Sequence, residues 1–168
     1  MRIEILSHLN QVQATHWNRL VIDNNPFMRH EFLVALEDNA CVGENFGWLP
    51  RHIVIYEGSE LVGALPLYEK YNSYGEFVFD NAWAQAYQHQ GMSYFPKIVS
   101  AIPYTPASGQ RLLVTIGREA EIYPLLLQAT LEIAHQLKAS SFHCLFPLEE
   151  QHQWLHQQGL LTRHDCQF

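Results

Sequence analysis

Residues 52–68 have the sequence HIVIYEGSELVGALPLY, in which two β-rich runs flank four turn-forming residues. The runs 52–56 and 61–68 are rich in the branched and aromatic side chains that favour strands. Glu57-Gly58-Ser59-Glu60 between them has the polarity and the glycine of a short connection. The segment therefore predicts a β-hairpin in the middle of a sheet.

One strand and two helices are predicted before the hairpin. Residues 2–6 alternate in the manner of a strand, and residues 11–22 carry apolar side chains at an approximately helical spacing. A break at Asn24-Asn25 is followed by Pro26, which suits the first turn of a second helix. That helix has a core face of Phe27, Phe32, Leu33 and Leu36, and its water-facing residues are expected to be Arg29, Glu31 and Glu37. Residues 43–50 are predicted to form a loop.

More strands and helices follow the hairpin. Residues 97–102 and 111–115 are predicted strands around a 103–109 loop. A long helix is predicted at 121–137, where apolar residues recur at helical spacing and Pro124 is tolerable only in the first turn. The remaining predicted elements are a buried strand at 141–146, a helix at 149–158 and a strand over 160–168.

This order of elements predicts an α/β (α+β) fold for a single domain that spans 1–168. The central sheet is expected to be mixed but mostly antiparallel, with helices on both faces. A doubly wound nucleotide-binding fold would instead alternate strands and helices from its beginning. A length of 168 residues suits one domain with one core.

Composition excludes several classes of protein. The net charge of −7, without a cluster of Lys and Arg, opposes binding of nucleic acid by this chain alone. Cys41, Cys144 and Cys166 are an odd set without CxxC spacing, which predicts reduced thiols and a cytoplasmic location. We expect no membrane span and no signal peptide, because no apolar run is long enough.

Three stretches carry a resemblance to a bacterial protein family. They are NPFMRHEFL at 25–33, PLY at 66–68 with SYGEFVFD at 73–80, and YFPK at 94–97 with PYTP at 103–106, Gly109 and RLL at 111–113. They resemble the peptidoglycan biosynthesis or recognition proteins, which are related to the Fem-type aminoacyltransferases of the GNAT N-acyltransferase superfamily. The resemblance implies a GNAT-like acyl-CoA N-acyltransferase fold. It also implies that this chain is the N-terminal half of a tandem-domain protein, with a second acyltransferase-like domain as its partner.

The resemblance further implies an acyl donor, either acyl-CoA or an aminoacyl-tRNA. Acetyltransferases hold the donor's pyrophosphate in a (Q/R)xxGx(G/A) turn before the long helix, where backbone N–H groups meet the anion. We place the corresponding turn at 103–111, which has one glycine and two prolines, so that coenzyme A binding in the usual manner is in question. Candidate ligand contacts there are Thr105, Ser108, Gly109 and Arg111. The alternative is a rigid structural turn.

Glu76 and Asp80 are the candidate catalytic acids. They lie beside aromatic residues that include Tyr74 and Trp83, both candidate substrate contacts. In a strand the two carboxylates would be about 13 Å apart. In a helix they would be about 6 Å apart, close enough to shift each other's pKa and to supply a general base for an amine. The alternative is that both acids cap backbone groups or pair with Lys97 or Arg111.

His30 is a further candidate base, near the expected acceptor groove, unless it is simply a polar residue of a helical first turn. His152 and His156 share a helix face at the spacing of a two-histidine metal site, but no third ligand is recognisable, and we expect no metal. Cys144 is expected to be inert. The large aromatics Trp48, Trp83 and Trp154 either line a groove for a sugar or lipid or belong to the core.

Two functions follow from the sequence. The first is an enzyme that transfers an acyl or aminoacyl group to an amine on a cell-wall precursor or another small acceptor. The second is a non-catalytic, degenerate domain that binds a ligand or supports a second acyltransferase domain. The discriminating feature is whether the strands beside the 103–111 loop splay apart or are closed by side chains.

Overall fold

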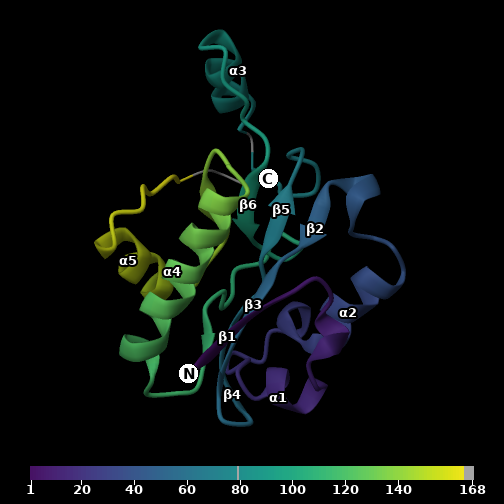
Figure 1. Cartoon of the computed structure of the whole chain (residues 1–168), viewed down its shortest axis with the longest axis vertical. Coiled ribbons are helices and arrows are strands. Elements are labelled where there is room, and N and C mark those ends of the chain that lie inside the picture. Colours follow the sequence, from purple (N-terminus) through teal and green to yellow (C-terminus); the bar gives the residue numbers. More distant parts are fainter. Residues whose placement is uncertain (79, 165–168) are drawn as a thin grey trace.

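The computed structural model describes residues 1–78 and 80–164 of the 168-residue chain (Figure 1). Its strands form two four-stranded sheets. The first is antiparallel and has the order β1 (Arg2–Leu6), β3 (His52–Glu57), β4 (Glu60–Leu65) and β7 (Leu113–Val114). The second has the order β2 (Trp48–Pro50), β5 (Tyr68–Lys70), β6 (Lys97–Ser100) and β8 (Phe142–Cys144), and only its β6–β8 pair is parallel.

The predicted hairpin is confirmed, and its second run joins the two sheets. β3 pairs with β4 from Ile53↔Leu65 to Glu57↔Glu60, with a register shift between Ile55 and Tyr56. The run 61–68 is divided at Pro66, which has no N–H to donate to a ladder, so that β4 belongs to the first sheet and β5 to the second. β6 then pairs antiparallel with β5, and β7 pairs antiparallel with β4.

Helices cover both faces of the first sheet, as predicted. α4 (Glu119–Gln136) and α5 (Glu149–Gln157) lie on one face, where Ile53 and Ile55 enter their core. α1 (Ala14–Asn18) and α2 (His30–Asp38) lie on the other, where Val54 packs with Trp17 and Leu33 (Figure 1). The alternation of side chains along β3 therefore supplies both cores. Short 3₁₀ turns are η1 (Leu9–Gln11), η2 (Pro26–Met28) and η3 (Glu44–Phe46).

α4 approaches the sheet closely because residue 63 has no side chain. A Cβ atom on Gly63 would lie 2.4 Å from Cγ2 of Ile122, the first buried residue of α4. α4 begins at Glu119, two residues before the predicted start, so that Pro124 lies in the second turn rather than the first. None of the helices among the described residues has the length and apolarity that a membrane span requires.

α3 (Asn81–His89) projects from the body of the molecule beyond the ends of β5 and β6 (Figure 1). It has no buried residue. We do not predict this helix from the sequence, because it is short and has only two large apolar side chains, Trp83 and Tyr87.

Other elements also differ from the prediction. The helix predicted at 11–22 is limited to η1 and the short α1, because residues 20–29 turn back to meet the 108–111 segment. The predicted loop 43–50 contains β2, an edge strand. Residues 160–164 form no strand, and the rest of that predicted strand, with Cys166, lies outside the described residues.

Candidate functional site

Four charged side chains are buried together at the end of the sheet where β5 ends and β6 begins. We call them the lysine–carboxylate cluster: Lys70, Glu76, Asp80 and Lys97. Lys70 and Lys97 are directly opposite each other in the β5–β6 register. Two like charges in this position oppose strand pairing. The segment after β5 brings Glu76 and Asp80 over them, so that the buried charges balance. All four residues are at most 3% exposed.

Lys97 is the centre of the cluster. Its Nζ donates to Oε2 of Glu76 at 2.7 Å and also to Oδ2 of Asp80. The Tyr94 hydroxyl donates to the same Asp80 oxygen at 2.8 Å. Residues 71–78 and Asp80 are in neither a strand nor a helix, so neither predicted separation of the two acids applies. The acids meet through Lys97, which is the pairing that the sequence offered as the alternative to catalysis.

Lys70 has weaker partners. Its Nζ donates to the carbonyl of Tyr74 at 3.1 Å and to Oδ1 of Asn72 at 3.3 Å, and it lies 3.7 Å from the centre of the Trp48 ring. Oε1 of Glu76 is 3.9 Å away, which is an ion-pair distance without a hydrogen bond. Burial lowers the pKa of Lys70 to about 7, although the charge of Glu76 opposes the shift.

The two carboxyl groups differ in their electrostatics. Burial raises the pKa of Glu76 despite its contact with Lys97. Burial would also raise the pKa of Asp80, but hydrogen bonds from Lys97, Ser73 and Tyr94 outweigh it and lower that pKa. Among the described residues, Oε1 of Glu76 and Oδ1 of Asp80 are buried without a hydrogen-bond partner. Each acid therefore keeps one oxygen that can accept a proton or an N–H group.

His143 on β8 belongs to the surroundings of the cluster. Burial, and secondly the charge of Lys97, lower its pKa to about 4. Its Nε2 lies 2.7 Å from the Ser141 hydroxyl, and its ring packs edge-on against Tyr94 with 6.4 Å between centroids. The sequence reasoning missed Lys70 and His143, and only the alternation of the strands that bear them could have suggested that they share an end of a sheet.

The rings of Tyr74 and Trp83 lie outside the lysine–carboxylate cluster. The Tyr74 ring is 67% exposed and packs edge-on against Tyr104, while its carbonyl accepts from Lys70 and from the indole N–H of Trp48. Trp83 is 54% exposed on the projecting α3. A role for these rings in substrate binding stays a prediction.

His30 lies apart from the cluster, at the start of α2, where its Nε2 donates to the carbonyl of Leu9 at 3.1 Å. The side chain of Glu37, which we predicted to face water, is instead only 2% exposed. It accepts from Nε2 of His52 at 2.7 Å and from the Leu9 N–H at 2.7 Å. The prediction was wrong because the spacing along one helix does not reveal a buried polar partner on another element. Arg29 and Glu31 are exposed.

The backbone N–H groups at the end of the 103–111 loop are satisfied by other segments of the chain. The N–H groups of Gly109, Gln110 and Arg111 donate to the Phe146 carbonyl, to Asp23 and to Gln151, respectively. The Arg111 guanidinium is fully buried, donates to the carbonyls of residues 107, 110 and 145, and has its pKa lowered to about 10 by burial. Thr105 donates to the Pro103 carbonyl, and the Ser108 carbonyl accepts from Asn25. Ligand binding by Thr105, Ser108, Gly109 and Arg111 stays a prediction.

Side chains close the space between β7 and the segment that follows β8. Oε1 of Gln151, on α5, accepts from the Arg111 and Leu112 N–H groups at 2.7 and 3.2 Å. Its Nε2 donates to the Leu112 carbonyl at 2.7 Å. Closer to β6, the Leu145 N–H donates to the Ser100 carbonyl, and Gly109 bridges to Pro147. The strands therefore do not splay apart here.

The turn that directly precedes the long helix lies at 115–118, not at 103–111, because β7 separates the two. The Gly117 N–H donates to Oε1 of Glu119 at 3.1 Å. Arg118 pairs with Glu57 and with Glu121. The chain's own acids therefore occupy the place where an acetyltransferase would hold a pyrophosphate, and these residues do not fit coenzyme A in the usual manner.

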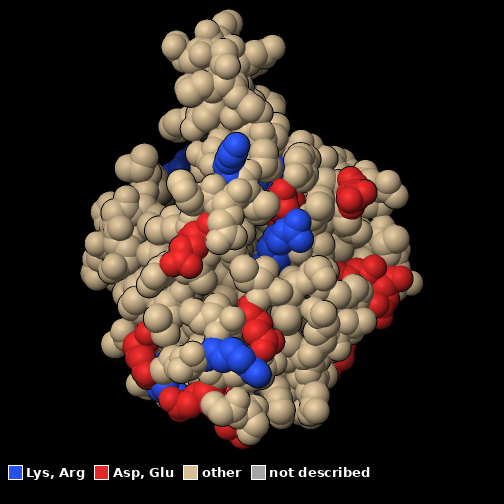
Figure 2. Space-filling model, viewed as in Figure 1, with Lys and Arg blue, Asp and Glu red and all other residues tan. Residues whose placement is uncertain are grey.

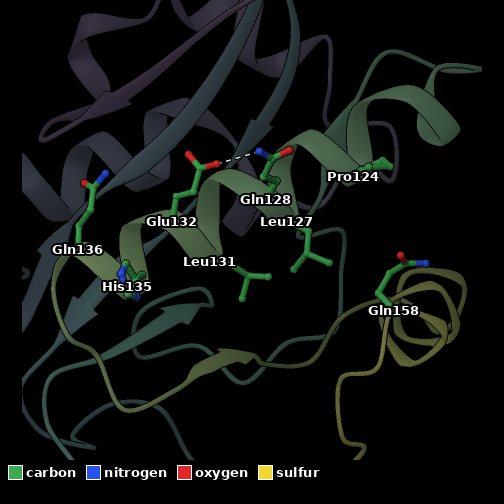
Figure 3. Close-up of a pocket in the computed structure, with 8 residues that line it drawn as sticks. All are labelled: Pro124, Leu127, Gln128, Leu131, Glu132, His135, Gln136 and Gln158. Atoms are coloured by element: carbon green, nitrogen blue, oxygen red, sulfur yellow. Dashed lines mark hydrogen bonds between the residues drawn. The ribbon is translucent and has the colours of Figure 1, made fainter.

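Other candidate features are independent of the cluster. His152 and His156 have ring centroids 6.5 Å apart, and within 1–78 and 80–164 no three His, Cys, Asp or Glu residues are grouped to hold a metal. Burial raises the pKa of Cys144 to about 12. Trp48 is fully buried, and Trp154 packs against Tyr123. An open groove of about 540 Å³ follows the outer side of α4, where Leu127, Leu131 and Gln158 line it (Figure 3).

Three solved structures resemble this chain in fold. An aminoglycoside 6'-N-acetyltransferase from Acinetobacter haemolyticus has a TM-score of 0.60 at 12% identity, with 100% of this chain and 96% of that chain covered. A ribosomal-protein-alanine N-acetyltransferase from Brucella melitensis biovar Abortus 2308 has a TM-score of 0.56 at 14% identity (100% and 97% covered). An aminoglycoside 6'-N-acetyltransferase from Acinetobacter baumannii has the same score and identity (99% and 95% covered).

At these identities the likeness shows the fold alone, and it confirms the predicted GNAT-like class. No curated protein sequence matches the chain. A family model described as FemAB-like, peptidoglycan biosynthesis/recognition, matches residues 8–168. The chain therefore belongs to the FemAB-like peptidoglycan biosynthesis/recognition family and has the fold of the N-acetyltransferases.

Proposed function

We propose that this domain takes part in the transfer of an acyl or aminoacyl group to an amine, on a cell-wall precursor or a related small acceptor. The lysine–carboxylate cluster is where the acceptor amine is received. The observation that carries the proposal is Oε1 of Glu76, which is buried without a hydrogen-bond partner and lies 3.9 Å from Nζ of Lys70. Family membership supports the cell-wall acceptor.

The two acids have different roles in this proposal. Glu76, whose pKa is raised, is the base that takes a proton from the amine as its nitrogen attacks the acyl carbon. The bond from that carbon to the sulfur or oxygen of the thioester or ester donor breaks, and the departing thiol or hydroxyl takes up the proton from Glu76. Asp80, which is held by Lys97 and Tyr94, stays ionised and orients Lys97. No step is assigned to coenzyme A, because the Gly117 N–H before the long helix is bonded to Glu119, and Gln151 is bonded to the backbone beside β7.

The test compares two buried glutamates in the full-length protein. Glu76→Gln removes the base, whereas Glu69→Gln alters an equally buried glutamate that pairs with Arg51 outside the cluster. Transfer of labelled acyl or aminoacyl groups to amine acceptors is the measurement. We expect Glu76→Gln to reduce transfer by roughly 10²-fold or more, the usual contribution of a general base, and Glu69→Gln to retain it. Equal rates for the two variants would contradict the proposal.

The closed strand junction favours a second candidate function, a non-catalytic domain that supports a second acyltransferase domain. Gln151 fills the space in which a pantetheine arm would lie. Calorimetric titration of this chain with coenzyme A tests it, and we expect no binding. Binding with the affinity of an ordinary acetyltransferase would eliminate this candidate. In either case the proposed setting is the cytoplasm, together with a second acyltransferase-like domain.

A further inference from the structure

β1 is an outer strand of the first sheet, and the described part of the chain places no strand on its far side. It has five residues and is the longest of the strands at the sheet edges, because β2 and β8 have three residues each and β7 has two. An edge strand presents unpaired backbone N–H and C=O groups, which proteins often protect with a proline or a bulge. β1 has neither, since its five residues pair with β3 in unbroken register. Its outer edge is therefore open to another strand.

The side of β1 that faces α4 is apolar and only partly covered. Ile3 and Ile5 lie opposite Ile55 and Ile53, which belong to the core beneath α4. Ile55 and Ile53 are fully buried, whereas Ile3 and Ile5 are 43% and 50% exposed. Together with residues of α4, Ile3 and Ile5 line a groove of about 320 Å³. A strand added to β1 would place its own side chains beside these two isoleucines and remove their apolar surface from water.

The opposite side of β1 carries one charge of each sign, and the order of these charges matches a second copy of the same strand. Arg2 and Glu4 have side chains that are 64% and 39% exposed, and they pair with each other at 2.9 Å. In an antiparallel pair that is symmetric about Ile3, Arg2 of each copy lies opposite Glu4 of the other. Opposite charges in this position stabilise strand pairing. Over the part of the body where Figure 1 places β1, Figure 2 shows acidic and basic side chains side by side.

Other self-pairings of β1 bring like charges together. Symmetry about Glu4 would place two glutamates opposite each other, and symmetry about Arg2 would do the same with two arginines. A parallel pair in register would oppose both residues to their own copies. Like charges directly opposite each other are destabilising. The charges of β1 therefore select one arrangement, and every copy of the chain supplies both members of it.

The same arrangement also brings the apolar sides together. Ile3 meets its own copy, and Ile5 lies opposite Met1 of the other chain, whose side chain is 54% exposed. A twofold axis through this pair joins the two sheets into one and leaves both α4 helices on the same face, as an interface between identical surfaces requires. We propose that β1 is the interface with a second copy of this chain, paired antiparallel and centred on Ile3.

The first experiment measures the mass of the complete chain by sedimentation over a wide range of concentration, and we expect a dimer in equilibrium with monomer. Arg2→Glu produces a strand with two acids and Glu4→Arg a strand with two bases, so each variant alone should dimerise at least tenfold more weakly. An equimolar mixture of the two restores opposite charges at both positions and should dimerise like the wild type. Arg19→Glu is the matched control, because it breaks an exposed ion pair with Glu60 outside β1 and should leave the dimer intact.

The second experiment tests the register with single cysteines. Residues directly opposite each other in an antiparallel pair have Cα atoms about 5 Å apart, which is within the reach of a disulfide. Ile3→Cys should therefore form a cross-linked dimer under mild oxidation. Ile5 would lie four residues from its own copy, about 13 Å away. Ile5→Cys should therefore not cross-link, and neither should the wild type with its native cysteines.

Circular dichroism and thermal melting of the variants, measured at concentrations where the wild type is monomeric, show whether each variant is folded. A complete chain that stays monomeric at every concentration, as it would if another segment or protein covered β1, overturns the proposal. A dimer that neither charge variant weakens also overturns it, as does a mixture of the two variants that stays monomeric. A cross-link through Ile5→Cys in place of Ile3→Cys would show that the register is wrong.

Discussion

Lys70 and Lys97 show how much the surroundings decide what a side chain does. They are opposite each other in one ladder and equally buried. Lys97 contacts both carboxylates, whereas Lys70 has only neutral hydrogen-bond acceptors and the Trp48 ring. The two acids therefore depend on Lys97 for charge balance. Burial of Lys70 is compensated less, and this lowers the pKa of Lys70.

Removal of the two lysines should have unequal effects. Lys97→Met leaves Glu76 and Asp80 buried without their main partner, and we expect it to lower the free energy of unfolding by about 3–5 kcal/mol. Lys70→Met should cost less than half as much, because it breaks no hydrogen bond to a carboxylate. Urea denaturation at pH 7 measures both. Equal losses would show that the charge balance is not centred on Lys97.

His143 should make the fold sensitive to acid. Its folded pKa of about 4 lies below the ordinary value of 6.5, so between these values the unfolded chain binds more protons than the folded one. The free energy of unfolding should therefore fall as the pH decreases from 6.5 towards 4. His143→Gln keeps a polar partner for Ser141 and should flatten this part of the profile, measured by urea denaturation at several pH values. An unchanged slope would assign the acid sensitivity to other groups.

At the scale of elements, the helices that the sequence predicts differ from α3, which it does not predict, in how they pack. α4 has buried residues at helical spacing and meets β4 at Gly63, whereas α3 has no buried residue. A long run of large apolar residues at helical spacing makes α4 predictable, whereas α3 has nine residues and only Trp83 and Tyr87 as large apolar side chains.

The contact of α4 with β4 can be tested by adding one methyl group. Gly63→Ala places a Cβ atom 2.4 Å from Cγ2 of Ile122, and we expect a loss of about 1–3 kcal/mol in the free energy of unfolding. Ile122→Ala removes that Cγ2 atom. The double variant should be more stable than the sum of the two single losses predicts, as a double-mutant cycle by chemical denaturation would show. Simple additivity would mean that α4 shifts without strain.

The fold was largely predictable from the sequence, but the candidate site was not. The hairpin at 52–68 and the helices on both faces follow from alternation and helical spacing, which are properties of neighbouring residues. The sequence singled out Glu76 and Asp80 and offered Lys97 or Arg111 as a partner, but it could not decide between the two. The burial of the Glu37 side chain likewise depends on His52 from β3. Contacts between elements far apart in the chain leave no local pattern.

On the scale of the whole molecule, the two sheets are joined by more than the hairpin. Gln151 of α5 binds the backbone of residues 111 and 112 with three hydrogen bonds, and Arg111 reaches back to the carbonyl of Leu145. The junction that is open in a working acetyltransferase is thus part of the packed interior here.

Loss of the Gln151 amide should destabilise this junction. Gln151→Leu has a similar volume but leaves two buried N–H groups and a carbonyl unpaired, and we expect it to lower the free energy of unfolding by about 2–4 kcal/mol. Gln153→Leu, on the exposed side of α5, is the control and should cost little. Thermal and urea unfolding measure both. Similar stability of the two variants would indicate that water replaces the amide.

Because Lys70 and Lys97 are paired directly, the segment between them can be replaced by another sequence without a change of strand register. Directly paired residues have Cα atoms about 5 Å apart, so everything from Tyr71 to Pro96 leaves and re-enters the sheet at one place. Such an insertion can lengthen, shorten or change sequence during evolution while the strands stay in register. It also carries Glu76 and Asp80, however. A natural or engineered replacement by a short turn would therefore have to supply two new negative charges or remove both lysines.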